Sequence, residues 1–121
     1  MPKKVLVVDD ELHILEAVSY VVREEGYSVF TAEDGEEALR LARAELPDLM
    51  ILDISMPKKD GHAVCRELKS DSTTRAIYVI MLTAKGQERD MRESYNCGAD
   101  EHMLKPFSPR GLRMRLHQLL D

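Results

Sequence analysis

Residues 47–57 read Pro-Asp-Leu-Met-Ile-Leu-Asp-Ile-Ser-Met-Pro, and this stretch decides the fold. Its four consecutive apolar residues, 49–52, suit a strand that is buried on both faces, as in a parallel sheet covered by helices. The flanking prolines leave too little room for a useful helix. The run ends at Asp53, and reactive groups in open parallel sheets gather beyond the carboxyl ends of the strands. Taken alone, an Asp in this position is more often a turn residue than a reactive group.

The composition predicts a single cytoplasmic domain over residues 1–121. The 121 residues, 44% of them hydrophobic, are enough for one domain with a real core. The net charge of −5 argues against nucleic acid or an anionic membrane as a main partner. Cys65 and Cys97 do not form a metal-ligand spacing, and a reduced pair is expected, although the sequence leaves a disulfide open. No apolar run approaches the roughly 20 residues of a membrane span, and no signal-peptide core is present.

Strand and helix patterns alternate along the whole chain. Apolar runs predict strands over residues 5–8, 28–32, 49–52, 77–82 and 100–104. Apolar residues at helical spacing, together with capping and turn signals, predict helices around residues 14–22, 38–46, 64–68, 87–97 and 109–120. Strict alternation is typical of an α/β domain with right-handed crossovers. We therefore expect a doubly wound, five-stranded parallel sheet with five helices.

Polar residues follow the predicted strands where each one ends. Asp9 and Asp10 follow the first strand, Asp53 the third, Thr83 the fourth and Lys105 the fifth. Because the carboxyl ends of parallel strands share one edge, these side chains should converge. Read singly, each has an ordinary explanation: the acidic run can cap a helix, Thr83 can begin a turn, and Lys105 can be a solvated charge.

Taken together, these residue types suit phosphoryl transfer. Three neighbouring carboxylates repel one another, and a hard divalent cation such as Mg²⁺, which prefers oxygen ligands, relieves that repulsion. An ammonium and a hydroxyl donor can neutralise the charge on the oxygens of a transferring phosphoryl group. Asp53 would then be the acceptor, since aspartyl phosphates are an established covalent intermediate.

The chain resembles the response regulator receiver family over essentially its whole length. The matching motifs are Val7-Val8-Asp9-Asp10-Glu11, Leu52-Asp53-Ile54-Ser55-Met56-Pro57 with Asp60-Gly61, Thr83-Ala84, and Gly98-Ala99-Asp100 leading to Lys105-Pro106. The resemblance implies a flavodoxin-like sheet of strand order 2-1-3-4-5. It implies that Asp53 accepts the phosphoryl group, and that Mg²⁺ is held by Asp10 directly, by Asp9 mainly through water, by Asp53 and by the backbone carbonyl of Ser55.

The resemblance also implies a set of switch residues. Thr83, Ala84 and Lys105 would contact the phosphoryl group and report its presence, and the bond between Lys105 and Pro106 would be cis. The family usually has Tyr or Phe three residues before the lysine, as a relay to the surface formed by the fourth helix, the fifth strand and the fifth helix. Here that residue is His102. We expect its ring to face the fourth and fifth helices and to form part of a partner surface rather than the relay.

The implied function is a phosphorylation-driven signalling module in a two-component system or phosphorelay. A histidine kinase or phosphotransfer protein would donate the phosphoryl group, and a downstream protein or an output domain absent from this chain would respond, without direct contact to nucleic acid or membrane. Enzymatic activity would be limited to the chain's own phosphorylation and dephosphorylation. A haloacid-dehalogenase-like phosphatase would need its two Asp residues two positions apart and a cap insertion. A flavodoxin-like electron carrier would need a phosphate-cradling loop where Asp9-Asp10-Glu11 stands.

Overall fold

The computed structural model describes residues 2–54, 56, 59–84 and 97–121. None of the helices in these ranges is long and apolar enough to cross a membrane. The strands are β1 (Lys4–Val8), β2 (Ser28–Ala32), β3 (Leu49–Asp53), β4 (Tyr78–Ala84) and β5 (Glu101–Lys105). The helices are α1 (Leu12–Glu24), α2 (Gly35–Glu45), α3 (Gly61–Ser70) and α5 (Pro109–Leu120).

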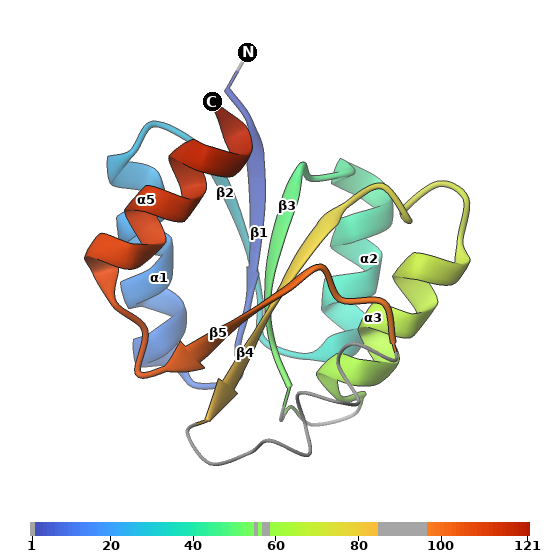
Figure 1. The fold of residues 1–121 in the computed structure, drawn as a ribbon. Helices are drawn as coiled ribbons and strands as arrows, with labels where there is room; N and C mark the ends of the chain where they lie inside the picture. Colours follow the sequence, from blue (N-terminus) through green and yellow to red (C-terminus); the bar gives the residue numbers. More distant parts are fainter. Residues whose placement is uncertain (1, 55, 57–58, 85–96) are drawn as a thin grey trace.

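The strands form one parallel sheet in the order β2-β1-β3-β4-β5 (Figure 1). The predicted fold class and strand order are therefore confirmed. The helix predicted over residues 87–97 lies, apart from Cys97, outside the described residues.

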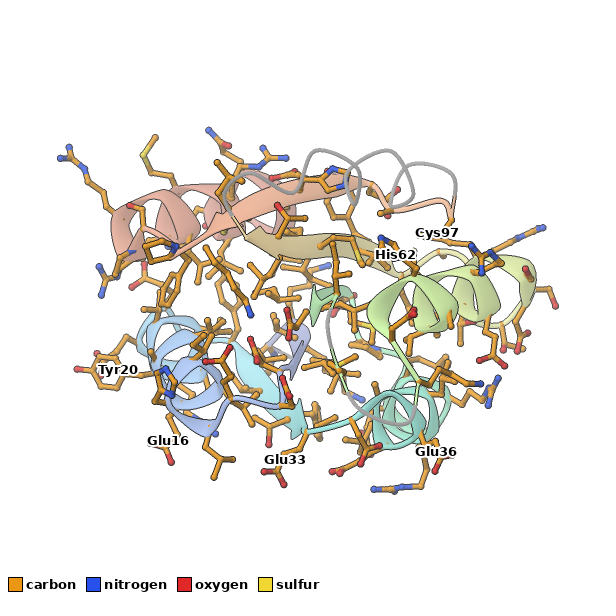
Figure 2. All side chains as sticks on the ribbon, turned by 90° about the horizontal axis from the view of Figure 1, so that it is seen from below. Glu16, Tyr20, Glu33, Glu36, His62 and Cys97 are labelled. Atoms are coloured by element: carbon orange, nitrogen blue, oxygen red, sulfur yellow. The ribbon has the colours of Figure 1, made fainter. Side chains whose placement is uncertain are left out.

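Helices cover both faces of the sheet, so it is doubly wound as predicted. The α2 and α3 side packs on one apolar cluster, which includes Met50 and Leu52. The α1 and α5 side packs on the other, which includes Leu49 and Ile51. In Figure 2, Tyr20 projects from α1 on one side of the sheet, and His62 lies on α3 on the other. Alternating residues of β3 thus enter opposite cores, and the strand is buried along its whole length.

Three strands, β3, β4 and β5, extend past the carboxyl ends of the predicted apolar runs. Asp53 is the last residue of β3 and pairs with Leu82, while Thr83 lies inside β4. Lys105 is the last residue of β5 and pairs with Ala84. Backbone hydrogen bonding continues past the point where the side chains become polar, so apolar runs place the carboxyl ends of these strands too early. Asp53, Thr83 and Lys105 are consequently held on strand ends, whereas Asp9 and Asp10 lie just after β1.

Leu46 corrects one helix prediction. The helical spacing assigned it to the apolar face of the second helix, but α2 ends at Glu45. Leu46 is instead the C-cap, with a left-handed backbone (φ 47°), and its side chain is 52% exposed. Its backbone N–H donates to the carbonyl of Ala42 at 3.0 Å. This conformation costs a residue with a Cβ atom about 1–2 kcal/mol.

We predict that Leu46→Gly raises the free energy of unfolding by about 1 kcal/mol, because glycine adopts the left-handed cap without that cost. Urea denaturation measures the change. Leu46→Ala is the matched control, since it removes the same exposed side chain but keeps Cβ and should bring no gain. Equal effects of the two substitutions would contradict the prediction.

Candidate functional site

The carboxyl edge of the sheet brings the predicted acidic residues together. Asp9 follows β1, Asp53 ends β3, and these two strands are neighbours in the sheet. One carboxylate oxygen from each of Asp9, Asp10 and Asp53 lies within 4.8 Å of the other two. Asp9 and Asp53 are buried, and Asp10 is exposed. We call these three residues the acidic pocket.

Lys105 is placed against this pocket from the end of β5. Its Nζ donates a hydrogen bond to Asp53 Oδ1 at 2.9 Å and lies 3.1 Å from Asp9 Oδ2. The same ammonium lies 4.0 Å from Glu11 Oε1. One cation therefore faces several carboxylates, and the pocket keeps an excess of negative charge.

Burial and charge together perturb the ionisation of the pocket. Burial is the largest cause that raises the pKa of Asp53, and the nearby Asp9 raises it further. The hydrogen bond from Lys105 opposes this, and the pKa of Asp53 settles at about 6, above its ordinary 3.8. For Lys105, burial alone would lower the pKa, but the hydrogen bond and charge of Asp53 outweigh it and raise the pKa. Each group thus stabilises the charged form of the other.

The residues of the acidic pocket fit a divalent metal ion. Asp9 is fully buried, and its Oδ1 accepts a hydrogen bond from the Glu11 N–H at 2.9 Å. Its Oδ2 is also buried, and no donor in the described part of the chain is aligned on it. An all-oxygen set with surplus negative charge is the environment that Mg²⁺ prefers. Ser55, the predicted source of a carbonyl ligand, lies outside the described residues.

Thr83 supplies a buried hydroxyl at the same edge. The residue is 1% exposed, and within the described ranges its Oγ1 has no hydrogen-bond partner. The neighbouring Ala84 pairs with Lys105 in the ladder between β4 and β5, and nothing is described of its side chain. The peptide bond between Lys105 and Pro106 is cis.

His102 is half-buried and does not face α5. The prediction that its ring faces the fifth helix is therefore wrong. Its β5 neighbour Glu101 pairs with Arg115 of α5, so the next residue along the strand faces the opposite side of the sheet. Burial, and then the charge of His62 on α3, lower the pKa of His102. Both effects favour the neutral form of the ring.

Sequence reasoning missed the role of Gly61. A Cβ atom on this residue would lie 2.3 Å from the Asp53 carbonyl oxygen, so only glycine fits. Its N–H donates to the Ile54 carbonyl at 2.8 Å, and Asp60 caps α3 by accepting a hydrogen bond from the Ala63 N–H at 2.9 Å. The Asp60-Gly61 pair signalled a turn, but not that the turn packs against the backbone of Asp53.

The sequence also gave no sign of the position of Glu11 beside Lys105. It occupies the N-cap position of α1, but its side chain makes no capping hydrogen bond. The helix-capping explanation of the acidic run therefore does not hold for Glu11, whose carboxylate lies beside Lys105 instead.

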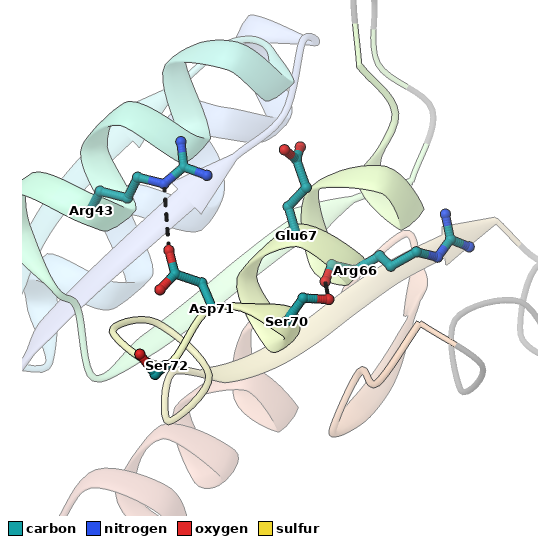
Figure 3. A pocket seen from close by; sticks show the side chains of 6 residues that line it. All are labelled: Arg43, Arg66, Glu67, Ser70, Asp71 and Ser72. Carbon is teal, nitrogen blue, oxygen red and sulfur yellow. Dashed lines mark hydrogen bonds and ion pairs between the residues drawn. The ribbon is translucent and has the colours of Figure 1, made fainter.

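A surface cleft of about 630 Å³ lies between α2 and α3 (Figure 3). It is lined by Arg43, Arg66, Glu67, Ser70, Asp71 and Ser72. Arg43 Nε pairs with Asp71 Oδ2 at 4.0 Å, and Ser70 Oγ donates to the Arg66 carbonyl at 2.7 Å. These residues come from the carboxyl ends of the helices and so lie toward the amino edge of the sheet, away from the acidic pocket. The acidic pocket therefore stays the candidate functional site.

Comparison with known proteins shows which family the chain is similar to. Residues 5–117 match the family model of the response regulator receiver domain. The chain is 47% identical over 120 residues to the alkaline phosphatase synthesis transcriptional regulatory protein PhoP of Bacillus subtilis, covering 99% of this chain and 49% of that protein. It thus spans about half the length of this curated relative.

Solved structures show the same likeness. A response regulator from Chloroflexus aurantiacus superposes with a TM-score of 0.93 at 34% identity, covering 99% of this chain and 98% of the other. The receiver domain of sensor histidine kinase PA1611 from Pseudomonas aeruginosa superposes with a TM-score of 0.91 at 26% identity, covering 99% of this chain and 98% of the other. That structure holds a magnesium ion in its active-site cleft.

We predict that Asp53→Asn stabilises the protein in a pH-dependent way. Because the pKa of Asp53 rises from 3.8 to about 6 on folding, the native state binds the extra proton, and the wild type loses stability as pH increases across this range. The variant cannot ionise here, so its advantage should be near zero at pH 4 and reach about 3 kcal/mol at pH 8. Urea denaturation in metal-free buffer measures the difference in the free energy of unfolding between Asp53→Asn and the wild type.

Asp48→Asn is the control for this prediction. Asp48 directly precedes β3 and accepts a hydrogen bond from the Lys4 N–H at 2.9 Å, outside the acidic pocket. Asp48→Asn should not raise the free energy of unfolding by a comparable amount. An Asp53→Asn advantage of equal size at both pH values would contradict the electrostatic account of the pocket.

Proposed function

Since this chain belongs to the response regulator receiver domain family, we propose that Asp53 is its phosphoryl acceptor. The observation that carries the proposal is the buried Asp53 carboxylate, bonded by Lys105 at 2.9 Å and flanked by Asp9 and Asp10 at the carboxyl edge. The family membership leaves no support for a dehalogenase-like phosphatase or a flavin carrier. Chemistry would be confined to the chain's own phosphorylation and dephosphorylation.

The transfer step uses groups already in contact. An Asp53 carboxylate oxygen attacks the phosphorus of a phosphohistidine, the new oxygen–phosphorus bond forms, and the nitrogen–phosphorus bond breaks with its electron pair leaving on the imidazole. Lys105, which now neutralises Asp53, would then face the phosphoryl oxygens. Asp9, Asp10 and Asp53 would hold Mg²⁺, with the Ser55 carbonyl as a further ligand. The bound ion would supply positive charge to the same oxygens.

The response would begin at Thr83. Its buried hydroxyl lies at the end of β4 and is available to donate to a phosphoryl oxygen. Lys105 and Pro106 link the pocket to the start of α5, so both neighbouring elements would report phosphorylation. The donor would be a histidine kinase or phosphotransfer protein in the cytoplasm. The recipient would be a target protein or an attached output domain, since the PhoP relative is a transcriptional regulator about twice as long.

The acceptor is tested by Mg²⁺-dependent labelling with acetyl phosphate, followed by mass spectrometry of the modified peptide. Wild type and Asp48→Asn should gain one phosphoryl group in the peptide that contains Asp53. Asp53→Asn should gain none, because the amide oxygen is not a nucleophile of comparable strength. Removing the metal with a chelator should abolish labelling of the wild type and of Asp48→Asn. Undiminished labelling of Asp53→Asn would exclude it as the acceptor.

The switch is tested with beryllofluoride, which stands in for the phosphoryl group. Thr83→Ala should lose most of the beryllofluoride-induced amide shifts along β5 and α5, because the reporting hydroxyl is gone. His102→Ala should keep them, because we assign that ring to the partner surface and not to the relay. Two-dimensional NMR compares both variants with the wild type. Loss of the shifts in His102→Ala, with retention in Thr83→Ala, would reverse the assignment.

A further inference from the structure

The end of α5 carries a hydrogen-bonded cluster that phosphoryl transfer does not use. It joins His117 and Asp121 to Glu25 and Tyr27, which lie in the connection between α1 and β2. We call these four residues the His117 cluster. The end of α5 lies beside the start of β1 at the amino edge of the sheet, whereas the acidic pocket lies at the opposite edge (Figure 1).

Both ring nitrogens of His117 face carboxylates. Nε2 lies 2.7 Å from Glu25 Oε1, and Nδ1 contacts Asp121 Oδ2. Ionised carboxylates only accept hydrogen bonds, so each ring nitrogen needs a hydrogen to satisfy its neighbour. A neutral imidazole has one such hydrogen and would leave a nitrogen lone pair against a carboxylate. The arrangement therefore requires the imidazolium.

Tyr27 is consistent with this protonation state, and Arg113 holds Glu25 in place. Tyr27 Oη donates its only hydrogen to Asp121 Oδ1 at 2.7 Å and lies 3.1 Å from His117 Nδ1, so toward the ring it can only accept. Arg113, one turn earlier on α5, pairs with Glu25 Oε2 at 3.6 Å and holds that carboxylate from its other oxygen. A cation in the last turn also suits the negative end of the helix dipole.

We propose that His117 is a pH-dependent clamp: as an imidazolium it ties the last turn of α5 to the connection between α1 and β2, and it releases that turn when it loses a proton. The hydrogen bonds to Glu25 and then Asp121 raise the pKa of His117. The pKa of Tyr27 is raised to about 12, chiefly by burial, and the pKa of Asp121 is lowered by its bonds to Tyr27 and His117. Of these three, the ring is the group that changes charge around neutral pH.

The direction of the pH effect follows from the raised pKa. The stabilisation is complete below the unfolded value of about 6.5 and is lost as pH rises through the folded-state value. Each pH unit between the two values corresponds to a tenfold change in the equilibrium between the closed and released turn. The protonation state of His117 would therefore affect α5 independently of Asp53.

The test combines an NMR titration of the His117 ring with melting curves from pH 5.5 to 9 at low salt. The midpoint should lie above 6.5, and the melting temperature of the wild type should exceed that of His117→Gln at low pH, with the difference vanishing above the midpoint. Arg113→Gln is the matched control, because it removes a cation from Glu25 without touching His117. Its effect on melting should not change over this pH range.

Two results would overturn the clamp. One is a His117 midpoint at or below 6.5. The other is a melting difference between wild type and His117→Gln that stays constant from pH 5.5 to 9. In the Asp53→Asn background the His117 ring should titrate with the same midpoint, and adding His117→Gln should change the melting temperature by the same pH-dependent amount as in the wild type. Failure of the clamp is therefore distinguishable from failure of the phosphoryl-acceptor proposal.

Discussion

The functional site depends on one contact, the hydrogen bond from the Lys105 ammonium to the buried Asp53 carboxylate at 2.9 Å. Isolated charges are costly to bury, and Asp9 and Asp53 are both nearly inaccessible to solvent. The parallel sheet resolves this by bringing the ends of β1, β3 and β5 to one edge, where a single cation serves two carboxylates. The compensation is incomplete, since negative charge remains in excess. That surplus is what makes the pocket suitable for a metal ion and then for a phosphoryl group.

The helix α5 connects the two edges of the molecule. It begins shortly after Lys105, it is anchored in the middle by the buried side chains of Leu112 and Leu116, and it ends in the His117 cluster. A change in Lys105 and a change in the charge of His117 would therefore act on opposite ends of one rigid element. Both changes are electrostatic and occur outside the apolar core.

Much of this could be predicted from the sequence, because apolar periodicity reports burial directly. The apolar run before Asp53, the alternation of elements and the convergence of Asp9, Asp53 and Lys105 all follow from local patterns and the geometry of parallel sheets. The predictions failed where a residue's conformation depends on tertiary contacts rather than on local sequence. Strand pairing carried β3 and β5 past their apolar runs to include the functional residues. Leu46 took a left-handed cap despite its side chain, and the need for glycine at position 61 arises from a contact with the Asp53 backbone.

The central claim is that Asp53 is held in a pocket with too much negative charge and that this charge is what the metal relieves. Carbon-13 NMR of the Asp53 carboxyl, titrated with and without saturating Mg²⁺, tests it most directly. Our account predicts a pKa of about 6 for Asp53 in the metal-free protein, above its ordinary 3.8, and a clear fall when Mg²⁺ is added. A midpoint near 3.8 that Mg²⁺ leaves unchanged would contradict it.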